Sequence, residues 1–148
     1  MSHLAKLKTS VTDAQALVRA LGRMGIDKSR IEVHDMAIQA RGYHQEETFN
    51  ANVIVRKNGS CGSDIGWEKD GRSGVFAAHL DEYNYQSSGQ HYSKEWQNRL
   101  YTFYNVEKAK MELEAKGIEH EELVDDVGRV QVRARFNVQD RSRFTNAR

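Results

Sequence analysis

The sequence contains no proline and a single cysteine, Cys61. A lone cysteine excludes a disulfide within the chain and any zinc site that needs several cysteines. It also fits a reducing compartment. Prolines often mark linkers, so their absence leaves no obvious place at which to divide the chain. We therefore expect one domain over residues 1–138, followed by a basic tail over residues 139–148.

Long apolar runs and an excess of one charge are also absent. No stretch approaches the ~20 apolar residues of a membrane-spanning helix, so no membrane partner is expected. The segment Met1–Lys6 lacks the apolar centre of a signal peptide, which favours a cytoplasmic location. The 22 basic and 21 acidic residues give a net charge of +1. This balance provides no general attraction to nucleic acid, which is therefore not the favoured partner.

Two segments carry apolar residues at the three-and-four spacing that predicts an amphipathic helix. The first covers residues 12–24, where Thr12 and Gln15 have the spacing of a capping box and Gly25 provides a stop. The second follows Ser93, a candidate N-cap, and ends at Gly117.

Residues 31–78 alternate apolar and polar side chains between turn signals, which predicts a run of antiparallel strands. The alternation slips at His34-Asp35, which indicates a bulge or a short turn. Asn58-Gly59 and Asp70-Gly71 predict tight hairpin turns. A short strand at Leu4–Thr9 precedes the first helix, and two strands, at 118–124 and 129–138, follow the second.

The predicted order of elements is β-α-β-β-β-β-α-β-β. Strands joined by tight turns are antiparallel, so this order indicates the α+β class. We expect a single, mainly antiparallel sheet with both helices covering one of its faces.

Short motifs spread over nearly the whole chain resemble domain-of-unknown-function family 1257, found in cyanobacteria, red-algal plastids and phages. They are the opening Met1-Ser2-His3 with Leu7-Lys8-Thr9, Leu21-Gly22 at the end of the first helix, Gly42-Tyr43, Val53-Ile54-Val55-Arg56, Asp64-Ile65-Gly66-Trp67, Leu100 and Tyr104 with Gly117, and Gly128-Arg129-Val130 through Arg135. His44 departs from the small residue expected after Gly42-Tyr43. The resemblance implies a cytosolic α+β protein, and it supplies no reaction and no catalytic residues.

The last predicted strand carries arginines on one face and apolar side chains on the other. Val130, Val132, Ala134 and Phe136 should face inward, and Arg129, Arg133 and Arg135 should face outward. Guanidinium groups at alternate positions lie about 7 Å apart along a strand and suit phosphates or carboxylates. Further candidate ligand-binding residues are Arg41, Tyr43, His44 and Lys57 on neighbouring strands, and Tyr83, Tyr85 and Tyr92 in the polar segment 81–92, where a tyrosine can stack on a base.

The segment before the arginines is acidic, and its charge is open to two interpretations. Glu119, Glu121 and Glu122 can pair across the hairpin with the arginines, which would neutralise them. Alternatively, the carboxylates can bind a divalent metal, although oxygen sites need converging ligands and an acidic strand alone does not provide them. We predict no metal and no cofactor.

An alternative site surrounds the polar segment 81–92. His79, Asp81 and Glu82 lie at its start and His91 at its end, so closure of the segment would bring an acid–base pair together. Against this, six histidines are scattered along the chain. No pair has the spacing of a zinc helix, and the glycines do not form a phosphate loop. Cys61 lies on a predicted strand and fits packing better than nucleophilic catalysis.

Three functions remain open on these residues. The favoured one is a non-enzymatic cytosolic module that binds an anionic small molecule, such as a nucleotide, or a protein partner. The first alternative is a small hydrolase or transferase that uses His79, Asp81, Glu82 and His91. The second alternative is a homo-oligomeric scaffold in which the strand at Leu4–Thr9 pairs with its copy across a two-fold axis.

Overall fold

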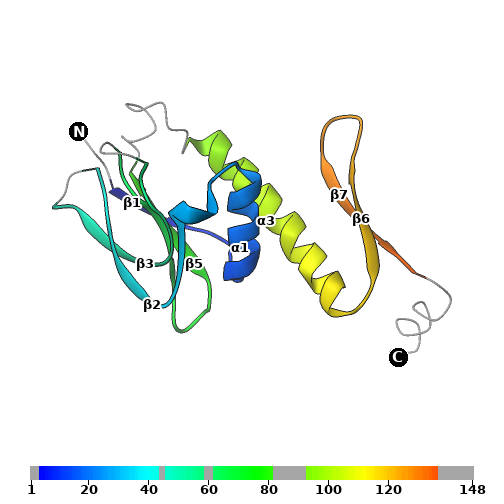
Figure 1. Ribbon diagram of the computed structural model, residues 1–148, viewed down its shortest axis with the longest axis horizontal. Helices are drawn as coiled ribbons and strands as arrows, with labels where there is room; N and C mark the ends of the chain where they lie inside the picture. The colour runs from blue at the N-terminus through cyan, green and yellow to red at the C-terminus, as the bar shows by residue number, and fades with distance from the viewer. Residues whose placement is uncertain (1–3, 44–45, 59–61, 82–92, 137–148) are drawn as a thin grey trace.

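The computed structural model describes residues 4–43, 46–58, 62–81 and 93–136 (Figure 1). In chain order they form β1 (Leu4–Lys8), α1 (Ala14–Arg23), the 3-10 turn η1 (Lys28–Arg30), β2 (Ile31–Arg41), β3 (Thr48–Val55), β4 (Ile65–Lys69), β5 (Phe76–Asp81), α3 (Lys94–Ala115), β6 (Glu119–Val124) and β7 (Val130–Arg135). The α+β class and the predicted order of strands and helices are confirmed. No helix among the described residues is long and apolar enough to cross a membrane.

The strands divide into two sheets, so the expectation of a single sheet was wrong. Five strands pair in the order β1-β5-β4-β3-β2, whereas β6 and β7 pair with each other as a separate antiparallel hairpin. The reason is the length of α3, whose 22 residues span about 33 Å at 1.5 Å per residue. The helix therefore carries the chain past the sheet before β6 begins. Figure 1 shows α1 and α3 between the five-stranded sheet and the hairpin.

The main core lies between the five-stranded sheet and the two helices, as predicted. Leu17 and Leu21 of α1 and Leu100 and Tyr104 of α3 are fully buried or nearly so against the sheet, and Trp67 is the largest buried sheet residue. The Tyr104 hydroxyl accepts the backbone N–H groups of Thr12 and Asp13 at 2.9 and 3.1 Å. This contact fixes the start of α1 against α3.

The N-cap of α1 is Asp13, so the predicted capping box at Thr12 was wrong. The Asp13 carboxylate accepts the N–H groups of Gln15 and Ala16, which satisfies two of the unpaired donors in the first turn. The Thr12 hydroxyl instead accepts from Lys108 Nζ at 2.9 Å. The predicted N-cap Ser93 is confirmed, because its hydroxyl accepts from the Trp96 N–H.

The bulge predicted in β2 is confirmed, and a buried amide holds it. The register between β2 and β3 shifts between Val33 and Ile38. Asn52 lies opposite the extra residues, and its side-chain nitrogen donates to the carbonyls of His34 and Asp35 at 3.2 and 3.1 Å. Its side-chain oxygen accepts from the N–H of Lys69 on β4. Asn52 therefore supplies the partners that the bulge removes from the ladder.

The predicted hairpins of β3 with β4 and of β4 with β5 are confirmed, but both connections are longer than two residues. Gly59 of the predicted Asn58-Gly59 turn lies outside the described residues. Val55 pairs with Ile65, so residues 56–64 join β3 to β4. The buried Asp64 carboxylate stabilises this connection by accepting the N–H groups of Arg41 and Lys57 at 3.0 and 2.9 Å. Lys69 pairs with Phe76, so residues 70–75 join β4 to β5.

A second, smaller core lies on the face of the sheet that the helices do not cover. The first half of β3 pairs with β2 but not with β4, and it folds over the sheet. Phe49 of β3 consequently stacks on His79 of β5, with ring centroids 4.9 Å apart, although β4 lies between these strands. Phe49 and Ala51 can pack here because Gly66 of β4 has no side chain. A Cβ at Gly66 would lie 2.7 Å from both Ala51 Cβ and Phe49 Cε2.

We predict that Gly66→Ala destabilises the fold by about 1–3 kcal/mol, because the methyl group forces Phe49 and Ala51 apart. Gly22→Ala is the matched control, since a Cβ at this helical position meets no atom within 4 Å. That change should stabilise the protein by about 0.5–1 kcal/mol, because alanine lowers the conformational entropy of the unfolded chain and has a higher helix propensity than glycine. Urea unfolding of both variants measures the difference, and equal stability of the two would contradict the second core.

Candidate functional site

The arginines of β7 face outward, as the alternation predicts. Arg133 and Arg135 are exposed, and Val130, Val132 and Ala134 are half-buried on the opposite face. Phe136, just past the strand, is 41% exposed, so its predicted inward position was wrong. We call Arg129, Arg133 and Arg135 the basic row.

Each arginine of the basic row has a carboxylate partner on the hairpin. Arg129 Nε lies 2.7 Å from Asp125 Oδ2, and the Arg129 backbone N–H also donates to that carboxylate, which lowers the pKa of Asp125. Arg133 lies 3.8 Å from Glu121, and Arg135 contacts the same carboxylate. Two guanidinium groups thus share one glutamate. Exposed pairs of this kind contribute only about 0–1 kcal/mol, so another anion can compete for them.

The other candidates for the anion site lie on the five-stranded sheet and not beside the basic row. Arg41 and Lys57 are exposed on β2 and just after β3, where their backbone N–H groups meet at Asp64. The Tyr43 N–H donates to the buried Asp81 carboxylate at 3.2 Å. These residues therefore do not widen the arginine patch. His44, Tyr83, Tyr85 and Tyr92 lie outside the described residues.

His79 pairs with a glutamate that the sequence analysis did not select. Its Nε2 lies 2.9 Å from Glu68 Oε1, and its side chain is 10% exposed beneath Phe49. Asp81 is fully buried. His79 and Asp81 thus lie within the packed face of the sheet, while Glu82 and His91 fall outside the described residues. Gly66 lies opposite His79, so Glu68 is the diagonal neighbour of His79 on the same face, a placement that only the register of β4 with β5 reveals.

A hollow with several cations lies beside this pair. It has a volume of about 560 Å³ between β1 and the connection from β4 to β5. Its lining includes three lysines and two carboxylates: Lys6, Lys8, Lys69, Glu68 and Asp70. Thr9, Ser73 and Ala77 also line it. We call this hollow the lysine groove. Lys8 on β1 and Glu68 on β4 both lie opposite Ala77 on β5, so the small alanine forms the floor between two long side chains.

The charges of the lysine groove leave cations available to a ligand. Lys6 lies 3.7 Å from Glu68, whereas Lys8 and Lys69 have no carboxylate partner within the described part of the chain. The Asp70 carboxylate accepts the N–H of Arg72 and the hydroxyl of Ser73, which lowers its pKa. The register places Lys6 and Lys8 on the face of the sheet that also carries Glu68 and Ala77, whereas Lys69, opposite Phe76, follows on the helix-covered face at the end of β4. All three lysines line the hollow, which lies at this end of the strands.

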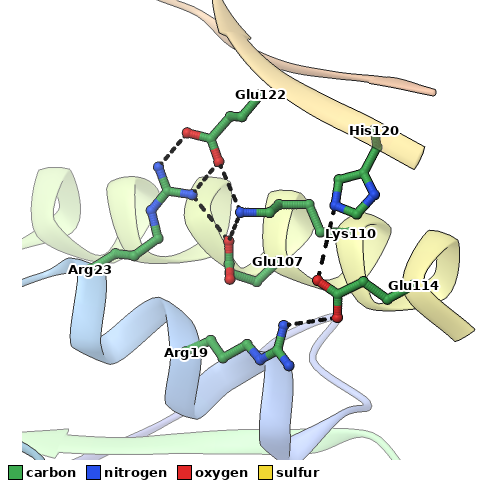
Figure 2. A network of polar contacts seen from close by, with 7 residues as sticks. All are labelled: Arg19, Arg23, Glu107, Lys110, Glu114, His120 and Glu122. Atoms are coloured by element: carbon green, nitrogen blue, oxygen red, sulfur yellow. Dashed lines mark hydrogen bonds and ion pairs between the residues drawn. The ribbon is translucent and has the colours of Figure 1, made fainter. Parts of the chain in front are cut away.

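A charged cluster joins the hairpin to both helices (Figure 2). Arg23 of α1 donates through both terminal nitrogens to Glu122 of β6, at 2.6 and 2.7 Å, and reaches Glu107 of α3 at 3.1 Å. Lys110 lies 3.3 Å from Glu107 and 3.5 Å from Glu122. The hydrogen bonds from Arg23 lower the pKa of Glu122, and those to Glu122 raise the pKa of Arg23. We call these four residues the Arg23 cluster.

A second paired group lies at the edge of the five-stranded sheet. Arg56 donates to both oxygens of Glu32, at 2.6 and 3.1 Å, and to Asp64 at 3.1 Å. His34 lies 2.9 Å from the same Glu32 carboxylate. The Arg56 guanidinium, with a smaller effect of His34, lowers the pKa of Glu32 to about 2. This group ties β2 to the connection after β3.

No group of three or more metal-ligating side chains occurs within the described ranges. No protein-family model, no curated protein and no solved structure matches the chain. The resemblance to family 1257 therefore stays a prediction.

We predict that the stability of the protein falls as the pH is lowered from about 4.5 toward 2, in part through Glu32. The pKa of Glu32 is lower in the folded chain than its ordinary value of 4.5, so folding favours the ionised form. This contribution is complete above pH 4.5 and is lost as the carboxyl group is protonated.

Carbon-13 NMR titration of the Glu32 carboxyl group measures its midpoint directly. Arg56→Gln should move the midpoint up toward 4.5, because the main hydrogen-bond donor is removed. A midpoint that is near 4.5 in the unmodified protein would contradict the Arg56 contact.

Proposed function

We propose that the protein is a non-enzymatic binding module that holds a small phosphate-bearing ligand, such as a nucleotide, in the lysine groove. Ammonium groups and hydroxyl groups around an open hollow are the donors that phosphate oxygens accept. The observation that carries the proposal is a hollow whose lining includes three lysines, of which Lys8 and Lys69 have no carboxylate partner within the described residues. A single cysteine and a net charge of +1 are compatible with action in the cytoplasm.

The basic row is the second candidate location for the same ligand. Its support is that, among the described residues, Arg133 and Arg135 share one carboxylate, that of Glu121. Two guanidinium groups beside one carboxylate leave positive charge for another anion. The lysine groove combines cations with a concave surface, so we place the ligand there.

Self-association through β1 has weaker support. Paired β1 strands related by a two-fold axis would bring Lys6 and Lys8 of both copies close together, and like charges on neighbouring strands repel. Exposed lysines on an edge strand are a common protection against such pairing.

We predict that Lys8→Ala with Lys69→Ala weakens the binding of pyrophosphate and of adenosine phosphates by at least about tenfold, since each charged hydrogen bond contributes on the order of 1.5–3 kcal/mol. Isothermal titration calorimetry at low ionic strength measures the affinity. Binding should weaken as salt is added, because the contacts are ionic.

The matched control is Arg133→Ala with Arg135→Ala, which removes two exposed cations on the hairpin and should leave the affinity unchanged. If only the arginine variant loses affinity, the ligand binds the basic row and the lysine groove is wrong. If the unmodified protein binds neither ligand at millimolar concentration, the proposed function itself is wrong.

A further inference from the structure

The hairpin of β6 and β7 has strand edges that no other described strand occupies. β7 pairs with β6 on one side, and its other side has no strand partner among the described residues. A two-stranded hairpin is marginally stable by itself, and a third strand would strengthen it. Open edges of this kind accept extended peptides as additional strands.

The hairpin is held in place, so its edge is presented in a fixed position. Ile118, just before β6, is 4% exposed, and Glu122 of β6 is gripped by Arg23 of α1 through two hydrogen bonds. Figure 2 shows Arg23, Lys110 and Glu107 converging on β6 from the two helices. A preorganised edge loses less conformational entropy when a partner strand binds.

The two faces of β7 differ in chemistry along this edge. The outer face carries Arg133 and Arg135, with side chains 66% and 58% exposed. Glu121 of β6 lies directly opposite Arg133 on the same face. The inner face carries the half-buried Val132 and Ala134. A strand that adds to this edge would therefore meet arginines on one face and an apolar row on the other.

We propose that β7 binds an extended segment of another protein in which acidic and apolar residues alternate. Acidic side chains of that segment would lie beside the basic row, which would place each arginine between carboxylates of two strands. Its apolar side chains would extend the row of Val130, Val132 and Ala134. The period of two residues in a strand makes both matches possible at once. This surface is separate from the lysine groove, so the inference does not depend on the proposed function.

A second copy of the chain does not fit this edge. Two-fold pairing of β7 with β7 would set one row of arginines beside another, which is repulsive. If β6 of one copy paired with β7 of the next, each copy would add two strands to a continuous sheet. Neighbouring copies would then lie only two strand spacings, about 9.6 Å, apart. A body that contains two helices and a five-stranded sheet is wider than this in every direction.

Fluorescence anisotropy with synthetic peptides tests the proposal on the full chain. The probe is a labelled peptide of alternating glutamate and valine, and a peptide of the same composition with its glutamates in one block is the control for net charge. Two further versions carry N-methyl groups on one or the other set of alternate amides. We expect the alternating peptide to bind, the blocked peptide to bind at least about tenfold more weakly, and one N-methylated version to lose binding, since it cannot form the ladder.

Arg133→Glu with Arg135→Glu should weaken binding of the glutamate peptide by at least about tenfold and create binding of a lysine–valine peptide. Both arginines are exposed, so the variant should melt at a similar temperature to the unmodified protein. The groove variant Lys8→Ala with Lys69→Ala should bind the glutamate peptide normally.

Three results would overturn the proposal. Equal binding of both N-methylated peptides would show a charge effect without strand addition. Binding unaffected by the charge reversal would place the peptide elsewhere. A dimer in sedimentation experiments that disappears in the charge-reversal variant would mean that another copy occupies the edge. The peptide experiments on the unmodified protein decide the question even if the reversal variant does not fold.

Discussion

The guanidinium group of Arg23 makes the shortest polar contacts between the hairpin and the helices. It joins α1 to α3 through Glu107 and joins both helices to β6 through Glu122, across 84 and 99 residues of sequence. Apolar residues of the hairpin contribute less evenly: Ile118 is buried, Val130, Val132 and Ala134 are half-buried, and Val124 is 65% exposed. Arg23 also lies 4.4 Å from the centroid of the Phe103 ring, which favours the cation there. The other polar contacts to α3 are longer, at 3.5 Å from Lys110 to Glu122 and 3.9 Å from His120 to Glu114. Loss of the Arg23 contacts should therefore loosen the hairpin on α3.

The edge strands β1, β2 and β7 differ in how open they are to a further strand. This difference distinguishes the lysine groove, beside β1, from the edge of β7. The β1 edge carries Lys6 and Lys8, and β2 is interrupted by the bulge that Asn52 holds. Both devices discourage the addition of further strands. The same lysines of β1 line the lysine groove, so edge protection and ligand binding use the same charges there. β7 is regular and carries arginines, which attract an acidic strand as readily as they repel a basic one.

Local patterns in the sequence were sufficient to predict the elements, and they were insufficient to predict the connections. The stripe of α1, the cap at Ser93 and the alternation of β7 each depend on residues within one or two turns, and each is confirmed. The lengths of the two connections depend on partners that are distant in sequence. Asp64 reaches back to the N–H of Arg41, and no local signal marks that contact. Because the sequence does not give the strand registers, the contact of His79 with Glu68 could not be foreseen. The separation of the hairpin from the sheet was also missed, because it follows from the length of α3.

Hydrogen exchange of the backbone amides in Arg23→Met tests the docking of the hairpin most directly. Methionine keeps most of the apolar stem against Phe103 and removes the hydrogen bonds to Glu107 and Glu122. The account predicts that the amides of β6 and β7 exchange much faster than in the unmodified protein, whereas those of β3, β4 and β5 keep their protection. Unchanged protection of the hairpin, or an equal loss of protection in both sheets, would contradict it.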